Sequence, residues 1–400
     1  MAKGYLIVNV YLENESYPVE GALVTISGDN YEKTFLTDID GKTNMIELNA
    51  PEKEYSLVPQ DEVRPYAVFD LKVTKKGLGS TIIKGVEILP EETSLQDVFM
   101  NTKGEVIDLP KHELWGEYED KIQEEPIKDE SELHRVLPRV IIPEYIIVHD
   151  GVPTNASAPQ RIVPFIDYIK NVASSEIFST WPLESLRANI HAIVSFTLNR
   201  VFTEWYRSRG YRFTITSSPA FDQKYTHNRT IFRTISDVVD DIFRYYIRLP
   251  GMIQPFFAQY NDGVKSNHPG RLSQWGSVDL ANRGRTALQI LRHYYTSTLT
   301  LEVAPEVIGL PVSFPGFNLN LNSCGEEVLT IQNRLNRIRT HYPGIPVISP
   351  ANGIYNESTR SAVQTFQRVF NLPVTGVVNF ATWFRISNIF IAVAGLQKGV

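Results

Sequence analysis

The sequence has 400 residues, of which 42% are hydrophobic and 21% are charged, values that are ordinary for a globular protein. A chain of this length predicts two to four domains rather than one core. Its one cysteine, Cys324, excludes an intramolecular disulfide and a metal site built from cysteines. The apolar segment 386–396 is too short to span a bilayer, and the start has no apolar run of signal-peptide length. The sequence therefore predicts a protein made without export.

The formal net charge of −6 is unevenly distributed along the chain. Residues 1–131 hold 13 Lys and Arg against 27 Asp and Glu, whereas the remainder holds 26 against 18. A basic C-terminal two-thirds suits an anionic polymer such as nucleic acid, teichoic acid or peptidoglycan. The open alternative is that surface charge merely differs between domains.

The N-terminal segment, residues 1–110, has the pattern of β-structure. Short runs rich in Val, Ile, Tyr and Thr alternate with turn clusters, and none of them has helical periodicity. Strands are predicted at 5–12, 22–27, 33–37, 66–74, 80–89 and 95–100. A small β-sandwich is the expected fold. The stretch PVEGALVTISG, followed by FLTDIDGKT, resembles transthyretin-like and carboxypeptidase-regulatory-like modules, which implies a module without catalysis.

Residues 111–138 separate this segment from the rest of the chain. They are dense in charge, with more acidic than basic side chains, and prolines stand near their end. This composition predicts an exposed acidic linker that is accessible to proteases.

The region 139–308 is predicted to be an α+β domain. Apolar residues recur at three- and four-residue steps, which predicts helices at 163–178, 182–210 and 235–248. Pro182 suits the first turn of the second helix, and Gly210 suits its end. Short strands are predicted at 212–216, 255–260 and 298–303.

The last segment, 315–396, is predicted to be a module of three helices. Helices are expected at 326–342 and at 358–370, with Ser358 as the N-cap of the second, and a third starts at 379. The motifs V-x-x-I-Q-x-x-L, G-I-Y-x-x-x-T-x-x-A-V-x-x-F-Q and N-L-P-V-T-G-V-V follow one another here. Together they resemble the peptidoglycan-binding domain family found on many bacterial wall hydrolases.

This resemblance implies that most of the motif residues form a core. Val363 and Phe366, on one helix face, are expected to pack inside the module rather than to contact a ligand. The candidates for glycan contact are polar or aromatic residues at its rim: Tyr355, Arg360 and Gln367. Cys324 lies in a loop outside the motifs and is expected to be a small, partly buried residue.

Two segments of the central region resemble the stage II sporulation protein D family of peptidoglycan lytic transglycosylases. They are YIKNVASSEIFSTWPLESLRANIHAIVSFTLN, residues 168–199, and AQYNDGVKSNHPGRLSQWGSVDLANRGRTALQILRHYY, residues 258–295. The shared motifs are S-E, W-P and S-Q-x-G. The resemblance implies that Glu176 is the catalytic residue. It also implies sugar contacts by Ser273, Gln274 and Tyr260. Trp181 is a further candidate, for which packing in the core is the favoured alternative.

A lytic transglycosylase breaks the MurNAc–GlcNAc bond without water, because the muramic 6-hydroxyl closes on C1 and gives a 1,6-anhydro ring. An ordinary glycosidase needs two carboxylates, whereas this reaction needs one group that is first an acid and then a base. Such an acid must hold its proton near pH 7, which requires burial beside apolar groups. Ile177, Phe178 and Trp181 flank Glu176 in sequence and meet this requirement.

The order of the segments, from β-module to this domain to a wall-binding tail, resembles the clostridial spore cortex-lytic enzymes. Those enzymes are made as pro-forms and are cut by a protease at germination. The resemblance implies that residues 1–110 are a pro-region and that the cut lies in the acidic linker, before Val136. It also implies peptidoglycan and a germination protease as partners, no nucleic acid or membrane span, and a place in the spore near its cortex and coat.

Several acidic residues have a plainer interpretation. Without the family resemblance, Glu176 would be a first-turn charge that the helix dipole favours. Glu184 is expected to be such a solvated charge in the following helix. Asp237, Asp240 and Asp241 are expected on a solvated helix face.

No metal or other cofactor is expected. Some members of the resembled family hold a zinc near the second motif with cysteines and histidines, but this region has no cysteine. His227, His268 and Asp262 are too scattered in the sequence to make a metal site convincing. The family's G-H-G also becomes NHPG here, which leaves the shape of the groove open.

The sequence therefore predicts a lytic transglycosylase acting on spore cortex peptidoglycan in germination. The alternative is a wall-binding scaffold without catalysis, such as an amidase enhancer. A hydrolase or amidase is a third possibility. The lack of clustered His and Cys residues in the sequence argues against it.

Overall fold

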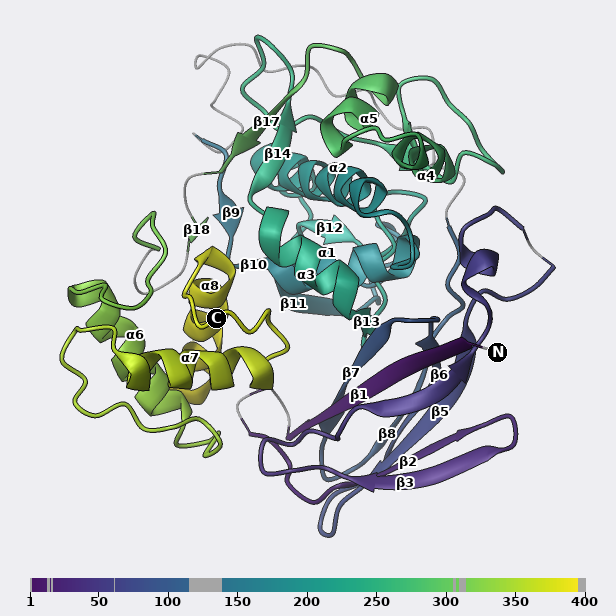
Figure 1. Ribbon diagram of the computed structural model, residues 1–400. Helices are drawn as coiled ribbons and strands as arrows, with labels where there is room; N and C mark the ends of the chain where they lie inside the picture. Colours follow the sequence, from purple (N-terminus) through teal and green to yellow (C-terminus); the bar gives the residue numbers. More distant parts are fainter. Residues whose placement is uncertain are drawn as a thin grey trace.

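The structure is a computed structural model that describes residues 2–12, 15, 17–60, 62–114, 139–304, 307–308 and 314–394. Figure 1 shows three parts: N-terminal strands at the bottom right, a central α+β part at the top, and C-terminal helices at the left. Each part has a hydrophobic cluster of its own. The boundaries that the sequence predicts between them stay predictions, and the linker lies largely outside the described residues.

The N-terminal part consists of two sheets that share one hydrophobic cluster. The strands are β1 (Ala2–Leu12), β2 (Leu23–Gly28), β3 (Tyr31–Leu36), β4 (Ile46–Ala50), β5 (Ala67–Thr74), β6 (Thr81–Ile88), β7 (Thr93–Met100) and β8 (Glu105–Asp108). One sheet has the order β3-β2-β5-β6-β8, and the other has the order β13-β7-β1-β4. Strand β13 (Ile231–Phe232) comes from the central part, so the second sheet crosses between two parts of the chain.

The turn at 38–42 shows why the T-D-x-D-G motif is needed at that place. The Asp38 carboxylate accepts the N–H groups of Asp40 and Lys42, which closes the turn. Gly41 has a φ of +75°, and a Cβ there would lie 2.5 Å from the carbonyl oxygen of Val10. Only glycine fits this position, because both the backbone angle and the space exclude a side chain.

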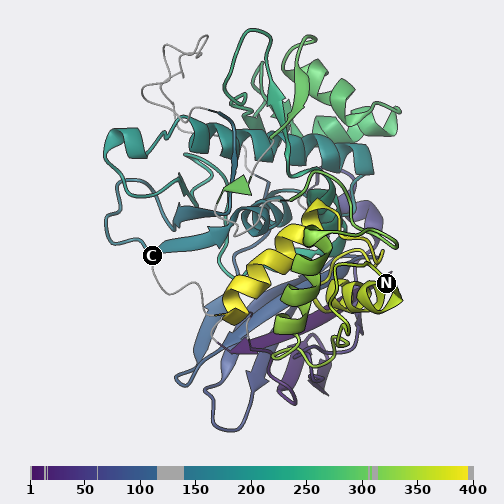
Figure 2. The ribbon, with the colours of Figure 1, turned by 90° about the vertical axis from the view of Figure 1, so that its left-hand side faces the viewer.

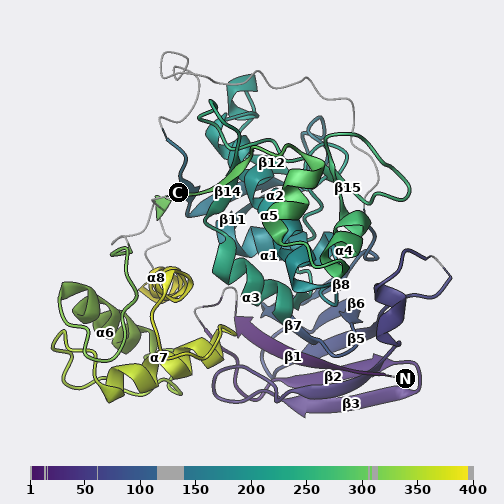
Figure 3. The same ribbon diagram turned by 45° about the horizontal axis from the view of Figure 1, so that its top comes forward.

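The central part packs helices around the long helix α2. Its helices are α1 (Phe165–Glu176), α2 (Leu183–Phe202), α3 (Arg233–Ile242), α4 (Gln274–Asn282) and α5 (Ala287–Tyr294). Its other strands are β9 (Ile142–Pro143), β10 (Tyr145–His149), β11 (Gln160–Pro164), β12 (Ile215–Thr216), β14 (Tyr245–Arg248), β15 (Tyr260–Asn261), β16 (Leu272–Ser273), β17 (Thr300–Val303) and β18 (Val307–Ile308). Nearly every residue of α2 is buried, as the spread of its apolar positions predicts. Helix α3 packs on β7, which places the central helices directly on the N-terminal sheet (Figure 3).

Two predicted helix ends are wrong. Helix α2 ends at Phe202 rather than near Gly210, because Glu204 has a φ of +46° and the Trp205 N–H bonds back to the carbonyl of Arg200. The helix predicted at 235–248 also stops early, at Ile242. The next residues form strand β14, which pairs with β17, so a tertiary pairing overrides the helical pattern.

The C-terminal part consists of the three predicted helices, α6 (Glu326–Ile338), α7 (Glu357–Val369) and α8 (Phe380–Ala394). The N-cap of α7 is Asn356, whose side chain accepts the Thr359 N–H at 3.0 Å, and not Ser358 as predicted. Val363 and Phe366 are buried in the core of this part, and Cys324 is exposed rather than partly buried.

The C-terminal helices lie beside both other parts (Figures 1 and 2). Lys42 donates to the carbonyl of Arg368 at the end of α7, at 2.8 Å. Arg385 of α8 pairs with Glu15 and with Asp167 of α1. The three parts therefore contact one another through specific polar groups. Among the helices that the structure describes, none combines the length and the apolar character that a membrane span requires.

Candidate active site

Glu176 is the last residue of α1, and only 1% of its surface is exposed. A first-turn position, where the helix dipole would favour a carboxylate, is therefore excluded. The C-terminal end of a helix carries partial negative charge, which disfavours the ionised form of a carboxyl group. The position of Glu176 thus favours a protonated acid rather than a helix-capping anion.

Both carboxyl oxygens of Glu176 have donors. The backbone N–H of Lys224 donates to Oε1 at 2.8 Å, and the Tyr260 hydroxyl donates to Oε2 at 2.5 Å. The side-chain amide nitrogen of Gln274 lies 3.4 Å from the backbone carbonyl oxygen of Glu176. Donors from three separate segments thus hold Glu176 in one orientation.

Burial raises the pKa of Glu176 to about 7, against the opposing effect of the two hydrogen bonds and of the Lys224 charge. Near neutral pH the carboxyl group is therefore close to half protonated. A group in this state can give a proton in one step and take one back in the next.

The other residues predicted to contact sugar are buried. The indole N–H of Trp181 donates to the carbonyl of Ser56, and Ser273 caps α4 by accepting the Gly276 N–H. Gln274 is bonded to the backbone of Glu176. These donors and acceptors serve internal hydrogen bonds, although the buried Oε1 of Gln274 has no partner among the described residues. Sugar contact by Trp181, Ser273 and Gln274 stays a prediction. Tyr260 belongs to the site, but through Glu176 rather than through an open groove.

The N-terminal part covers the segment that carries Glu176. Ser56 bonds to both Thr180 and Trp181, at 2.7 and 2.9 Å. The ring of His112 lies 4.6 Å from the ring of Phe178, and the Lys224 ammonium donates to the carbonyl of Lys111. Residues that follow Glu176 in the sequence, and Lys224, which donates to its carboxyl group, are thus in contact with residues of the N-terminal part and the start of the linker.

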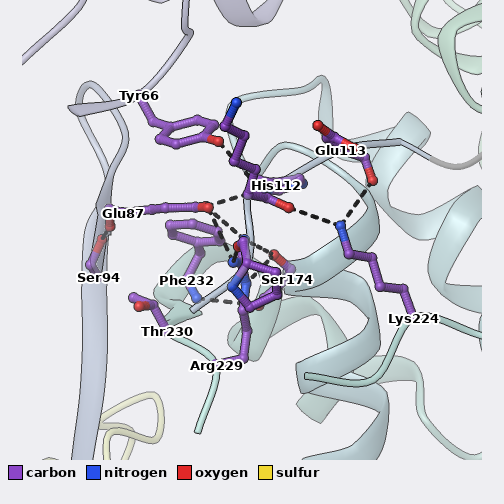
Figure 4. Close-up of polar contacts among 12 residues, drawn as sticks. Tyr66, Glu87, Ser94, His112, Glu113, Ser174, Lys224, Arg229, Thr230 and Phe232 are labelled. Carbon is purple, nitrogen blue, oxygen red and sulfur yellow. Dashed lines mark hydrogen bonds and ion pairs between the residues drawn. The ribbon is translucent and has the colours of Figure 1, made fainter. Parts of the chain in front are cut away.

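A buried ion pair lies at the centre of this contact (Figure 4). Arg229 donates with two nitrogens to the Glu87 carboxylate, and it also donates to the carbonyl of Ser174, two residues before Glu176. Burial would raise the pKa of Glu87, but the Arg229 charge and the His112 hydrogen bond hold it below its usual value. Burial lowers the pKa of His112 to about 4, so this imidazole is neutral near pH 7.

The residues considered for a metal do not converge. Asp262 is buried and accepts the N–H groups of its own loop, at Val264, Lys265 and Ser266. Within the described ranges, no group of three or more His, Cys, Asp or Glu side chains is placed to hold a metal ion, and His227 and His268 join no such group.

The prediction of a solvated acid is wrong for Asp240, whereas Glu184 keeps 34% of its side chain exposed. Asp240 is buried, and its Oδ1 lies 2.7 Å from the Lys170 ammonium. Glu184 is in the first turn of α2, as predicted, but it accepts the Ala287 N–H at 2.7 Å and so joins α2 to α5. Asp237 and Asp241 line a cavity of about 360 Å³ between α2, α3 and the C-terminal part.

In the C-terminal part, two of the three residues predicted to contact glycan are buried, and their contact with glycan stays a prediction. Tyr355 is fully buried and donates to the carbonyl of Gly376, and Gln367 is buried and bonded to the loop at 375–377. Arg360 is exposed enough to meet a ligand, with 40% of its side chain accessible. Polar atoms inside a small module are used to hold its loops, which is why these two side chains point inwards.

No sequence pattern points to Lys224, because its contact with Glu176 is made by a backbone N–H. Gln223, which bonds to Tyr260 at 3.2 Å, lies in the loop between β12 and β13, where no sequence motif indicates a role for it. The close pairing of DQKY with a buried acid is visible only in three dimensions.

Comparison with known proteins identifies one part of the chain. Residues 324–386 match the family model described as a peptidoglycan binding domain. No curated protein matches the chain. Among solved structures, the SleB N-terminal domain is 26% identical, with 19% of this chain and 97% of that chain covered and a TM-score of 0.17.

A second solved structure is the Coh3ScaB-XDoc_M2ScaA cohesin–dockerin complex from Acetivibrio cellulolyticus. It is 13% identical, with 24% of this chain and 56% of that chain covered and a TM-score of 0.16. At these TM-scores neither likeness carries an argument about fold or function. The family match does: the C-terminal part of the chain carries a peptidoglycan-binding domain, as the sequence predicts.

Proposed function

We propose that the chain is a peptidoglycan lytic transglycosylase with Glu176 as its one acid–base residue. The observation that carries the proposal is the setting of this carboxyl group. It is buried, its pKa is raised to about 7, and Lys224 is the one charged side chain among the described residues that acts on this pKa. A hydrolytic glycosidase would need a second carboxylate at the site.

The reaction proceeds in two steps that return the enzyme to its starting state. Glu176 gives its proton to the glycosidic oxygen, and the bond between C1 of MurNAc and that oxygen breaks. The muramic 6-oxygen then bonds to C1, and its proton passes to the Glu176 carboxylate. No water is consumed, and the product carries a 1,6-anhydro ring.

The N-terminal part is the pro-region in this proposal. Glu176 is 1% exposed, and the segment around it is in contact with Ser56, Glu87 and His112. A polysaccharide cannot reach a carboxyl group in this state, so the N-terminal part must separate or move before catalysis. The expected cut before Val136 lies outside the described residues.

The peptidoglycan-binding domain gives the proposed enzyme its substrate class. We propose spore cortex peptidoglycan as the substrate, the spore as the location and an activating protease as a partner. The domain borders the cavity at α2 and α3, through Leu372, Pro373 and Asn379. A glycan strand held by the domain would thus lie beside the helix that follows Glu176.

The test is digestion of purified cortex peptidoglycan by the chain after cleavage at a protease site engineered into residues 115–138 and release of the N-terminal fragment at the lowest urea concentration that separates the two fragments. Mass spectrometry of the released muropeptides should show anhydro-muramic ends, and Glu176→Gln should abolish them. Glu184→Gln is the matched control, because Glu184 lies on the next helix and does not contact Glu176.

The other outcomes separate the competing functions. Reducing muramic ends would identify a hydrolase, and free stem peptides would identify an amidase. Binding to the wall without release of any muropeptide would identify a scaffold. Each of these results would reject the transglycosylase.

A further inference from the structure

Gln223 and Lys224 are adjacent in the loop between β12 and β13. Lys224 donates to one oxygen of Glu176, and Gln223 bonds to Tyr260, which donates to the other. We propose that this dipeptide is the positioning element of the active site. Lys224 holds Oε1 with its backbone N–H, and Gln223 acts through Tyr260 to aim a hydroxyl proton at Oε2. The proposal rests on the proposed role of Glu176. It adds Gln223, a positioning residue that does not touch the reacting atoms.

The direction of each hydrogen bond follows from the backbone carbonyl of Ile193. A carbonyl only accepts, so the Gln223 amide nitrogen, 3.2 Å away, must face it. The second hydrogen of the same nitrogen then goes to the Tyr260 hydroxyl oxygen, also at 3.2 Å. Tyr260 has one proton, and its hydroxyl oxygen lies 2.5 Å from Glu176 Oε2, which accepts it. The tyrosine therefore donates to Glu176.

The opposite side of the Gln223 amide is also occupied. Its oxygen accepts from the Tyr168 hydroxyl at 3.1 Å and lies 2.8 Å from the Thr197 hydroxyl. Gln223 is fully buried, so a reversed amide would place its nitrogen beside the Tyr168 donor and its oxygen against the Ile193 carbonyl. Such a reversal would leave buried polar groups unpaired, which is costly.

The preceding residue anchors the loop. Asp222 is fully buried, and its Oδ1 pairs with Arg200 at 2.9 Å. Its Oδ2 accepts the Tyr206 hydroxyl at 2.6 Å and the Thr216 N–H at 3.0 Å. The loop that carries Gln223 is thus fixed on helix α2 before any substrate binds.

Two donors on the carboxyl group stabilise its ionised form, and burial opposes them. The balance leaves Glu176 able both to give and to take a proton near neutral pH. The titratable groups that face it are Tyr260, Tyr168 and the Lys224 ammonium. Without the Tyr260 donor, burial would raise the pKa of Glu176 further. The carboxyl group would then be too weak an acid to give its proton at its working pH.

The test follows the Glu176 carboxyl carbon by ¹³C NMR through a pH titration of the full chain, with Glu176→Gln to assign the signal. Tyr260→Phe should raise the pKa of Glu176 from about 7 to about 8 or above, the size of one hydrogen bond to a charged group. Gln223→Met should raise it as well. The double variant should match Tyr260→Phe alone, because Gln223 acts through the tyrosine.

The matched control is Gln332→Met, which removes a fully buried glutamine of the C-terminal part that donates to the Ile354 carbonyl. It should leave the pKa of Glu176 unchanged. If Gln223→Met shifts this pKa by the same amount with and without the Tyr260 hydroxyl, Gln223 does not act through Tyr260 and the proposal fails.

A measurement on the unsubstituted glutamine covers the case in which Gln223→Met does not fold. The ¹⁵N signal of the Gln223 side-chain amide should titrate with the pKa of Glu176 and should stop doing so in Tyr260→Phe. A signal that ignores pH in the unsubstituted chain would overturn the proposal. None of these readouts needs substrate, so a failure of the muropeptide test would reject the transglycosylase and leave the positioning result standing.

Discussion

Arg229 and Glu87 form a bidentate ion pair that joins the central part of the chain to the N-terminal sheet. The two distances between guanidinium nitrogen and carboxylate oxygen are 2.6 and 3.1 Å, and each side chain is 1% exposed. Arg229 also donates to Ser174, close to Glu176. One buried guanidinium thus links the covering part to the helix that carries the proposed acid.

Removal of one partner of this pair should destabilise the protein strongly. Glu87→Gln leaves the Arg229 guanidinium buried without a carboxylate, which costs about 3–5 kcal/mol in the free energy of unfolding. Urea denaturation measures the loss. Asp108→Asn is the control, because its pair with Lys84 is exposed at 73% and 52% and should contribute at most about 1 kcal/mol. Equal losses from the two variants would contradict the role given to the buried pair.

A cut in the segment 115–138 should leave the two fragments associated. Strand β13 pairs with β7 at Ile231 and Leu95, the Gln96 amide bonds to Thr230, and the ion pair with Glu87 is buried beside them. After cleavage at an engineered site, the fragments should elute together in size-exclusion chromatography. With Glu87→Gln they should separate at a lower urea concentration. Fragments that separate without denaturant would show that the cut alone uncovers Glu176.

Much of the secondary structure follows from sequence periodicity, but the contacts between distant segments do not. The alternation in β2 and the apolar steps in α6 and α7 predict elements that the structure contains. Helices α4 and α5, of nine and eight residues, were not predicted because so few turns give no clear period. The predicted end of the helix at 235–248 is wrong because Tyr245–Arg248 form strand β14 instead. This strand pairs with β17, a contact that the local sequence does not reveal.

The candidate site shows the same division. Glu176 was found through a family resemblance, while its place at the end of α1 and its partners depend on the fold. Tyr355 and Gln367 have the residue types of ligand contacts, yet their polar atoms hold loops inside the module. The chemical type of a polar side chain does not reveal whether it faces the solvent or the interior of the module.

The stability of the protein should depend on pH through Glu176. Its pKa is raised from 4.5 to about 7 in the folded state, so the folded chain holds this proton over a pH range where the unfolded chain has lost it. Stability from this group therefore falls as pH rises from 4.5 through 7. Glu176→Gln should match the unsubstituted protein at pH 4 and exceed it by about 2–3 kcal/mol at pH 8. Urea denaturation at both pH values gives the difference, and an equal effect at both would contradict the raised pKa.

Tyr355 and Arg360 should separate stability from wall binding in the C-terminal part. Tyr355→Phe removes the hydrogen bond to the Gly376 carbonyl inside the core and should cost about 1 kcal/mol in the free energy of unfolding. Sedimentation with insoluble peptidoglycan should remain unchanged, because the hydroxyl is buried and cannot meet the polymer. Arg360→Ala should leave stability within about 0.5 kcal/mol and should weaken sedimentation, since its side chain is accessible. A loss of binding in Tyr355→Phe at full stability would restore this tyrosine as a ligand contact.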